Sequence, residues 1–158
     1  MDQFEIPHGF KIVSGGQTGA DRAGLDWALA HQVAHGGWCP KGRRAEDGAI
    51  PARYELTETP SAGYLQRTEW NVRDCDTTVI FTLADQLTGG SLKTAGFAAK
   101  LRKPHLHVSA RVASKHLARF LAEHSVRTLN VAGNRESVAP GIYDWVLEVL
   151  SEALILVK

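Results

Sequence analysis

The sequence has little of several features that would place it in a special class of protein. It contains only two cysteines, Cys39 and Cys75, outside any C-x-x-C pair, so we expect no disulfide framework and a reducing, cytoplasmic location. No apolar run reaches the roughly 20 residues of a membrane helix, and the first residues lack the pattern of a secretory signal. The formal net charge of +1 gives no bulk attraction to nucleic acid or to a membrane surface.

The remaining composition is that of an ordinary globular domain, with 158 residues of which 44% are hydrophobic, and we expect one domain over residues 1–158. Apolar runs and punctuating residues predict strands near 11–14, 36–39, 77–82, 104–108 and 127–132, and helices near 20–34, 64–74, 91–102, 110–124 and 139–156. The strand segments 78–81 and 129–132 are continuously apolar or β-branched, as in parallel strands covered on both faces. This alternation predicts a single-domain, Rossmann-like α/β fold with a mostly parallel, doubly wound sheet and helices on both faces.

The stretch from Lys11 to Arg22 reads K-I-V-S-G-G-Q-T-G-A-D-R and predicts a short strand, a glycine-rich turn and the start of a helix. Glycine permits positive φ and lets a ligand come close to the backbone. The N–H groups in the first turn of the helix favour an anion. We therefore expect a phosphate to bind at Gly15, Gly16, Gln17, Thr18 and Gly19. The alternative is a tight turn that binds nothing.

Nucleotide-binding fingerprints match this turn only in part. The pattern G-x-G-x-x-G needs a glycine where Ser14 stands, and the P-loop needs a lysine just after Gly19. NAD binding would also use an acidic residue about 20 residues further on, where the chain has Lys41, Arg43 and Arg44 instead. The sequence therefore argues against P-loop ATPase chemistry and ordinary NAD binding, and it favours a phosphorylated small molecule.

Loops after other strands share this character. The carboxyl ends of parallel strands meet at one edge of the sheet, and ligands bind there near the point where strand order reverses. Beside the first turn, the loops at that edge offer as candidate ligand contacts Lys41, Arg43, Gly89, Gly90, Ser91, Gly133 and Arg135. Without a ligand, the same residues would be helix caps and solvated surface cations.

No group of residues identifies a catalytic or metal site. The serines have no sequence partner that indicates a nucleophile with its base. His105 and His107 lie two apart on a predicted strand, but a metal site would need a third ligand that the sequence does not place. Arg67 and Asn71 share one face of a predicted helix, a spacing that also suits a surface salt-bridge lattice. We therefore expect a binding protein, without catalytic residues and without a metal site.

Four ordered blocks, residues 14–28, 40–48, 64–76 and 131–137, resemble the molybdenum carrier family, which is related to Rossmann-like phosphoribohydrolases similar to lysine decarboxylases. The resemblance implies a homo-oligomer, commonly a tetramer, that binds molybdenum cofactor, a pterin with a phosphate tail. It also implies as ligand contacts Gly16, Gln17, Thr18, Gly19, Lys41, Arg43, Gly89, Gly90, Ser91, Gly133 and Arg135. Asn134 departs from the proline that relatives tend to have.

The related hydrolases suggest a second hypothesis, an enzyme that cleaves a nucleotide. Those enzymes carry a glutamate in a G-G-x-G-T-x-x-E motif. Aligned on Gly89 and Gly90, this chain has Leu92, Lys93 and Gly96 at the remaining defined positions, so that glutamate is missing. The resemblance therefore favours a carrier. Three loop carboxylates could still act as a general base for the alternative: Glu46, Asp47 and Glu136.

Overall fold

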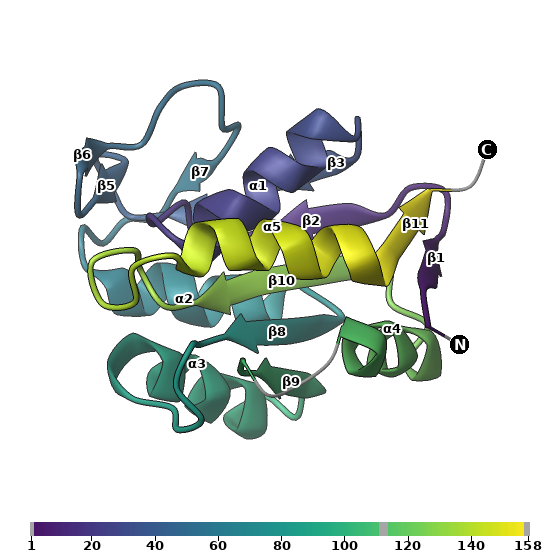
Figure 1. Ribbon diagram of the computed structural model, residues 1–158. Helices are drawn as coiled ribbons and strands as arrows, with labels where there is room; N and C mark the ends of the chain where they lie inside the picture. The colour runs from purple at the N-terminus through teal and green to yellow at the C-terminus, as the bar shows by residue number, and fades with distance from the viewer. Residues whose placement is uncertain (1, 111–113, 157–158) are drawn as a thin grey trace.

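A five-stranded parallel sheet lies at the centre of the computed structural model, which describes residues 2–110 and 114–156 (Figure 1). Its strands run in the spatial order β3 (Ala34–Gly36), β2 (Lys11–Val13), β10 (Thr128–Gly133), β8 (Thr77–Phe81) and β9 (His105–Val108). Every residue of β8 is buried, as expected for a strand covered on both faces. The predicted α/β fold with a parallel sheet is confirmed.

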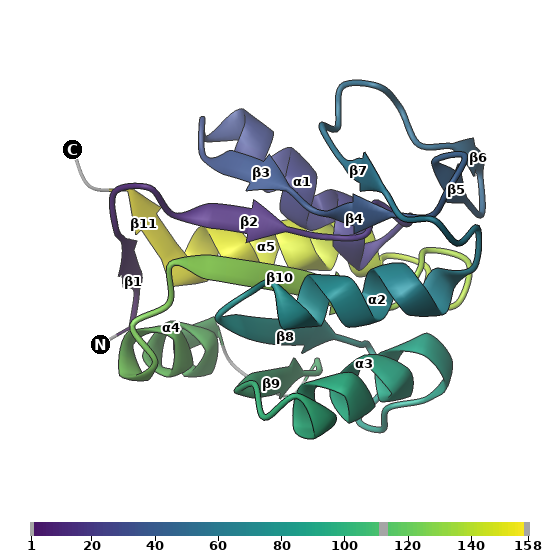
Figure 2. The same ribbon diagram turned by 180° about the vertical axis from the view of Figure 1, so that it is seen from behind.

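Helices cover both faces of this sheet (Figures 1 and 2). They are α1 (Ala20–Ala30), α2 (Tyr64–Arg73), α3 (Gly89–Lys100), α4 (Ser114–Glu123) and α5 (Ile142–Ala153). One face is packed by α1, α4 and α5, and the other by α2 and α3. The larger apolar core includes the buried side chains of Ile12, Phe81, Leu121, Leu129 and Leu150. The doubly wound arrangement follows from these two helical layers.

The strand order is that of a Rossmann sheet whose first strand comes last in the chain. Central β10 pairs with β2 on one side and with β8 on the other. If strands are counted from β10 onward through β2, β3, β8 and β9, the spatial order becomes 3-2-1-4-5, the usual Rossmann order. Strand order therefore reverses between β10 and β8, and the loops after these two strands flank the expected ligand crevice.

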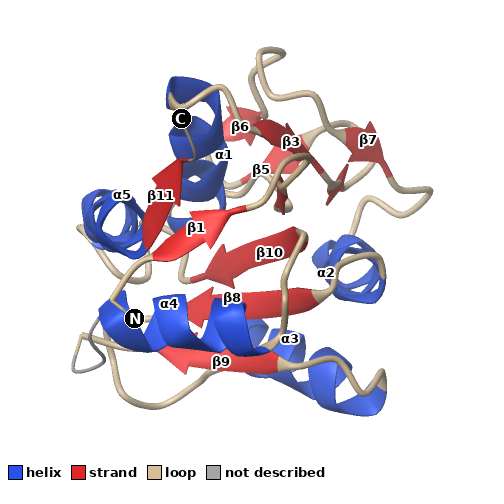
Figure 3. Ribbon diagram, turned by 90° about the vertical axis from the view of Figure 1, so that its right-hand side faces the viewer, coloured by secondary structure: helices blue, strands red, loops and turns tan. Residues whose placement is uncertain are grey.

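The two ends of the chain meet in a small sheet of their own. Strand β1 (Phe4–Ile6) pairs in parallel with β11 (Leu154–Leu156), at the end of the molecule that faces the viewer in Figure 3. The expected helix over 139–156 was too long at both ends. It begins after Gly141, which has a φ of +94°, and it ends where the backbone of Leu154 becomes extended to pair with β1.

The predicted strand over 36–39 is divided. Gly37, with a φ of +132°, separates β3 from β4 (Trp38–Cys39), and a Cβ there would lie 2.3 Å from the carbonyl oxygen of Ser14. Strand β4 leaves the main sheet and pairs with β7 (Thr57–Glu58). The segment between them, where the sequence predicts neither a strand nor a helix, contains the hairpin of β5 (Arg44–Ala45) and β6 (Gly48–Ala49). Helix α1 ends at Ala30, short of the predicted 34, because Ala34 already belongs to β3.

Helix α1 packs directly on the central strand at Gly24. A Cβ on this glycine would lie 2.9 Å from Cβ of Val131 in β10, closer than packed carbon atoms approach. Gly96 of α3 is a natural comparison, because a Cβ on it would meet nothing within 4 Å. One glycine is therefore required by packing, and the other only lowers helix propensity.

We predict opposite effects for the same substitution at these two glycines. Gly24→Ala should lower the free energy of unfolding by about 1–3 kcal/mol, since α1 must move away from β10. Gly96→Ala should raise it by up to about 1 kcal/mol through helix propensity. Urea denaturation of both variants and the parent chain measures the difference. Equal stability of the two variants would contradict the packing argument.

Candidate functional site

A cavity of about 410 Å³ opens where strand order reverses, at the carboxyl ends of β10 and β8. This volume is within the range of pockets that bind small organic ligands, roughly 300–1,000 Å³. Predicted contacts that line it are Gln17, Gly89, Gly90, Ser91, Gly133 and Arg135. Lining residues that the sequence analysis did not propose include Asp21, Tyr64, Arg67, Thr94 and Asn134. Tyr64 and Arg67 come from α2, whose contribution no glycine motif indicates.

The N-terminus of α3 forms one wall. Thr88 stands at the N-cap position without a side-chain hydrogen bond to the helix. Gly89 has a φ of +53°, and a Cβ on Gly89 or Gly90 would meet nothing within 4 Å. Because both glycines are exposed and line the cavity, a ligand can approach the first N–H groups of the helix closely. The partial positive charge of this helix end favours an anion.

Arginine side chains gather around Tyr64, the first residue of α2. The guanidinium carbons of Arg44, Arg67 and Arg135 lie 4.8, 5.4 and 5.3 Å from the centre of its ring. Arg67 and Arg135 also line the cavity, as does Lys93 of α3. The partial negative charge on an aromatic face favours cations at this distance. The mouth of the cavity is thus cationic, with one aromatic ring in its wall.

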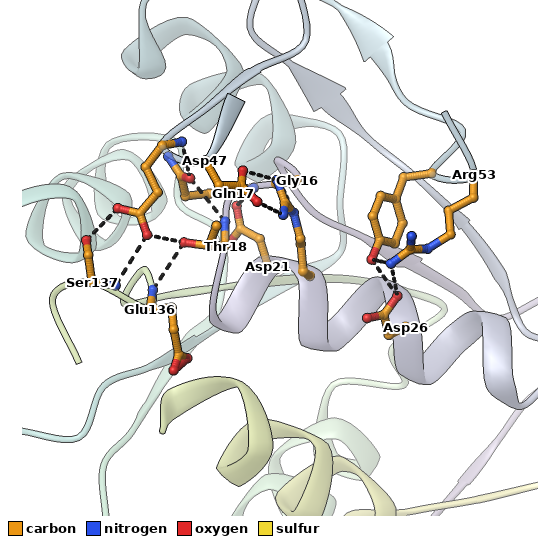
Figure 4. A network of polar contacts seen from close by, with 12 residues as sticks. Gly16, Gln17, Thr18, Asp21, Asp26, Asp47, Arg53, Glu136 and Ser137 are labelled. Atoms are coloured by element: carbon orange, nitrogen blue, oxygen red, sulfur yellow. Dashed lines mark hydrogen bonds and ion pairs between the residues drawn. The ribbon is translucent and has the colours of Figure 1, made fainter. Parts of the chain in front are cut away.

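The glycine-rich first turn already holds an anion, and that anion belongs to the chain. The N–H of Gln17 donates to Oδ2 of Asp21 at 3.1 Å. The N–H of Gly16 donates to Oγ of Ser14 at 3.3 Å. The N–H of Thr18 donates to Oε1 of Gln17 at 3.0 Å (Figure 4). The sequence predicts that these three N–H groups bind a phosphate. In the structure they have acceptors within the chain instead.

Glycines of this turn are required by close packing. A Cβ on Gly15 would lie 2.0 Å from Nη1 of Arg67, and one on Gly16 would lie 2.7 Å from Cδ1 of Leu56. A Cβ on Gly19 would lie 2.4 Å from the carbonyl oxygen of Asn134. Gly133 is similarly confined, since a Cβ there would lie 2.1 Å from the carbonyl oxygen of Phe81. Only Gly133 of these four lines the main cavity.

Asp21 is a buried carboxylate at the base of the cavity, and its relative exposure is 4%. Burial raises its pKa above the usual value, and the charge of Arg67 is the largest influence in the opposite direction. Nη1 of Arg67 lies 3.1 Å from Oδ2 of Asp21, and only 13% of the Arg67 side chain is exposed. Arg67 thus forms a buried ion pair between α2 and α1. It does not take part in the surface salt-bridge lattice that its spacing from Asn71 would also allow.

Gln17 is held in one orientation. Its Oε1 accepts the N–H of Thr18 at 3.0 Å and the N–H of Glu46 at 2.9 Å, so the opposite atom of the amide must be the NH₂ group. That Nε2 is buried and has no hydrogen-bond partner within residues 2–110 and 114–156, and the same is true of Nε in Arg67. Buried donors are nearly always satisfied in folded proteins. Two such donors belong to residues of this one cavity.

The two predicted cations of the second loop do not reach the cavity. Arg43 donates from Nε to the carbonyl oxygen of Ile50 at 3.0 Å, and from Nη2 to those of Pro51 and Tyr54 at 2.8 Å. It therefore stabilises the segment that follows the β5–β6 hairpin. Lys41 is exposed and is not among the lining residues that the structure describes.

The three loop carboxylates considered as general bases are engaged elsewhere. Glu46 accepts hydrogen bonds from the hydroxyls of Thr18 and Ser137 (Figure 4). Although burial opposes the change, these hydroxyls lower the pKa of Glu46. Asp47 pairs with Arg22 at 2.5 Å, and Glu136 accepts the N–H of Gly141 at 2.7 Å at the start of α5. Among the described residues that line the cavity, Asp21 is the only acidic one.

Residues 2–110 and 114–156 contain no group of three His, Cys, Asp or Glu side chains that could hold a metal ion. Nε2 of His107, one of the two histidines considered as metal ligands, lies 2.5 Å from Oγ1 of Thr82 and forms a hydrogen bond with it. Within the same residues, no helix has the length and apolar character to cross a membrane.

We predict that Arg67→Met destabilises the fold in a pH-dependent way. At pH 7 the free energy of unfolding should fall by about 3–5 kcal/mol, because the buried Asp21 carboxylate loses its partner. The raised pKa of Asp21 rises further in the variant, so a proton binds more tightly to the folded state than to the unfolded one. The destabilisation should therefore shrink as pH falls toward the unfolded value near 3.8 and grow as pH rises. Urea titrations of both proteins between pH 4 and 8 measure it, and adding Asp21→Asn should remove the pH dependence.

The chain is similar to known proteins both in sequence and in three-dimensional structure. The model of the circularly permutated YpsA SLOG family matches residues 12–154. A crystal structure of a protein from Syntrophus aciditrophicus SB, named "putative molybdenum carrier protein", is 44% identical, with a TM-score of 0.86 over 89% of this chain and 92% of its own. The sequence resemblance is thereby confirmed.

A second solved structure is that of (E)-4-hydroxy-3-methyl-but-2-enyl diphosphate reductase, which is 10% identical. The alignment covers 90% of this chain and 57% of the reductase, with a TM-score of 0.36. This similarity is too low to indicate a shared function. No curated protein matches. The name of this family describes a circular permutation, and in the five-stranded sheet of this chain the strand at the first Rossmann position, β10, comes last in the sequence. The chain belongs to the circularly permutated YpsA SLOG family.

Proposed function

We propose that this protein binds molybdenum cofactor, a phosphorylated pterin, in the 410 Å³ cavity and carries it without chemical change. The observation that carries the proposal is the uncapped, glycine-lined N-terminus of α3 facing a cavity with a cationic mouth. The protein from Syntrophus aciditrophicus, 44% identical over most of both chains and named for molybdenum carriage, supports the choice of ligand. A pterin ring with its phosphate is of the size that such a pocket accepts.

The phosphate is placed at Gly89, Gly90 and Ser91 in this proposal. The first turn, which the sequence favoured, has three of its N–H groups bonded within the chain. The start of α3 instead combines the helix dipole with the nearby side chains of Arg135 and Lys93. Arg135 is held only loosely by Glu46, at 3.8 Å, so its guanidinium can turn to a phosphate.

A carrier agrees with the acidic residues of the site better than a hydrolase does. A general base must reach the proton that it abstracts. Asp21 is paired with Arg67, while Glu46, Asp47 and Glu136 bond to other parts of the chain. These engagements leave the cavity suited to holding a ligand.

Assembly and location are parts of the same proposal. Leu65, Leu92 and Val138 are 50%, 55% and 64% exposed, and Leu65 and Val138 line the cavity. A homo-oligomer, such as the tetramer that the resemblance implies, would cover such side chains. Cys39 and Cys75 are both free and buried, which agrees with a reducing cytoplasm.

We predict that Gly90→Asp weakens ligand binding strongly while the fold remains stable. An acidic side chain in the first turn of α3 interacts favourably with the helix dipole, so the melting temperature should be unchanged or higher. The same charge repels a phosphate at the helix end, and affinity should fall about tenfold or more, equivalent to about 1.4 kcal/mol. The control is Gly96→Asp, the same change in the same helix at an open position away from the cavity.

Native mass spectrometry of the three proteins, purified from a molybdenum-replete host, measures the amount of bound phosphorylated pterin. The parent chain and Gly96→Asp should retain it, and Gly90→Asp should lose it. Retention of the ligand by Gly90→Asp would place the phosphate elsewhere. A parent chain that never contains a pterin would refute the carrier function.

A further inference from the structure

We propose that Gln17 determines which heterocycle the cavity accepts, by donating a hydrogen bond from Nε2 to a carbonyl oxygen of the ring. This inference rests on the proposed function, since it assumes that a phosphorylated heterocycle enters the cavity. It adds a residue, a group and a direction of hydrogen bonding that neither the family nor the named relative specifies.

The donor role follows from the contacts of the amide. Both lone pairs of Oε1 are engaged by backbone N–H groups, of Thr18 at 3.0 Å and of Glu46 at 2.9 Å. A rotated amide would bring its NH₂ group against these two donors, so the orientation is fixed. Gln17 therefore presents a donor, and its side chain has no hydrogen-bonding atom left to accept with.

The position of the amide directs this donor to a ligand. Gln17 is 5% exposed and lines the cavity, and its Nε2 has no hydrogen-bond partner among the described residues. Asp21 and Thr94, which are also buried, mark the same closed end of the cavity. The exposed Leu65, Lys93 and Val138 mark its mouth. A ligand oxygen that enters the closed end would satisfy a donor that the protein alone leaves unsatisfied.

Charge decides between a carbonyl and a second anionic group. Arg67 supplies the other unpartnered donor, Nε, but its positive charge is matched by Asp21 at 3.1 Å. The closed end is therefore close to neutral, whereas Arg135, Lys93 and the start of α3 make the other end cationic. A neutral carbonyl suits paired donors of this kind, because a desolvated anion there would be repelled by Asp21. The phosphate goes to the cationic end, and an oxo-heterocycle such as a pterin points its carbonyl inward.

The test compares two phosphates that differ only on this edge: (pterin-6-yl)methyl phosphate and its 2,4-diamino analogue, in which an amino donor replaces the carbonyl. The parent chain should bind the pterin about tenfold or more tightly, because a buried donor would otherwise face another donor. In Gln17→Met this preference should fall to within about twofold. Gln66→Met is the matched control, because Gln66 also accepts a backbone N–H, that of Ser61 at 2.8 Å, but does not line the cavity.

A second measurement needs no variant that might unfold. In ¹⁵N-labelled parent protein, the side-chain NH₂ signals of Gln17 should shift when the pterin phosphate is added, and shift much less with the diamino analogue. Undiminished preference in a folded Gln17→Met, or unmoved NH₂ signals at saturation with the pterin, would overturn the role of Gln17 alone. If the parent chain binds neither phosphate, both the proposed function and the role of Gln17 are refuted.

Discussion

The carboxylate of Asp21 in the first glycine-rich turn is the contact on which the rest of the site depends. It accepts the N–H of Gln17 and pairs with Arg67, and so joins the turn, the first turn of α1 and the middle of α2. Helix N-termini bind anions readily. In this chain a side chain in the first turn of the helix supplies the anion. Its presence gives the N–H groups of the turn acceptors within the chain, and it leaves the N-terminus of α3 as the helix end that we propose for the phosphate.

The permuted strand order explains why α3 can take that role. Because β10 fills the central position, the loops that flank the reversal of strand order follow β10 and β8. Those loops contain Gly133 and Arg135, and Gly89 and Gly90. The loop after β2, although it has the densest glycines, belongs to the second strand of the usual order. It borders the crevice through Gln17 and Asp21 and packs on the loop after β10, where the N–H of Ala20 donates to the carbonyl oxygen of Asn134 at 3.1 Å.

The sequence predicted the sheet well, whereas it could not tell which of its glycines face open space and which face other parts of the chain. Apolar strands such as 77–81 depend on local pattern, and they lie where the pattern places them. A glycine has two uses, close approach of a ligand and close approach of the chain itself, and the two look identical in a sequence. Gly89 and Gly90 face open space, whereas Gly15, Gly16 and Gly19 face other atoms of the protein. Only the tertiary contacts separate these cases.

Cations and carboxylates were ambiguous for a related reason, because each could bond to the chain or to a ligand. Arg43 was selected by its position after a strand, yet three backbone carbonyls accept its hydrogen bonds. Arg67, for which a surface role was considered, reaches the closed end of the cavity because the buried face of α2 is directed there. Strand pairing that spans the chain, as of β10 with β8, sets which loops meet, and no local pattern encodes it.

The cavity has two chemically different ends, and this polarity limits what it can hold. At one end the N-terminus of α3 and the side chain of Arg135 favour negative charge. At the other end the Asp21–Arg67 pair cancels its own charge, and hydrogen-bond donors remain. A ligand anionic at both ends would leave one anion beside the carboxylate of Asp21, and a ligand without an anion would forgo the helix end. A molecule with one phosphate and one neutral, oxygen-bearing ring satisfies both ends in a single orientation.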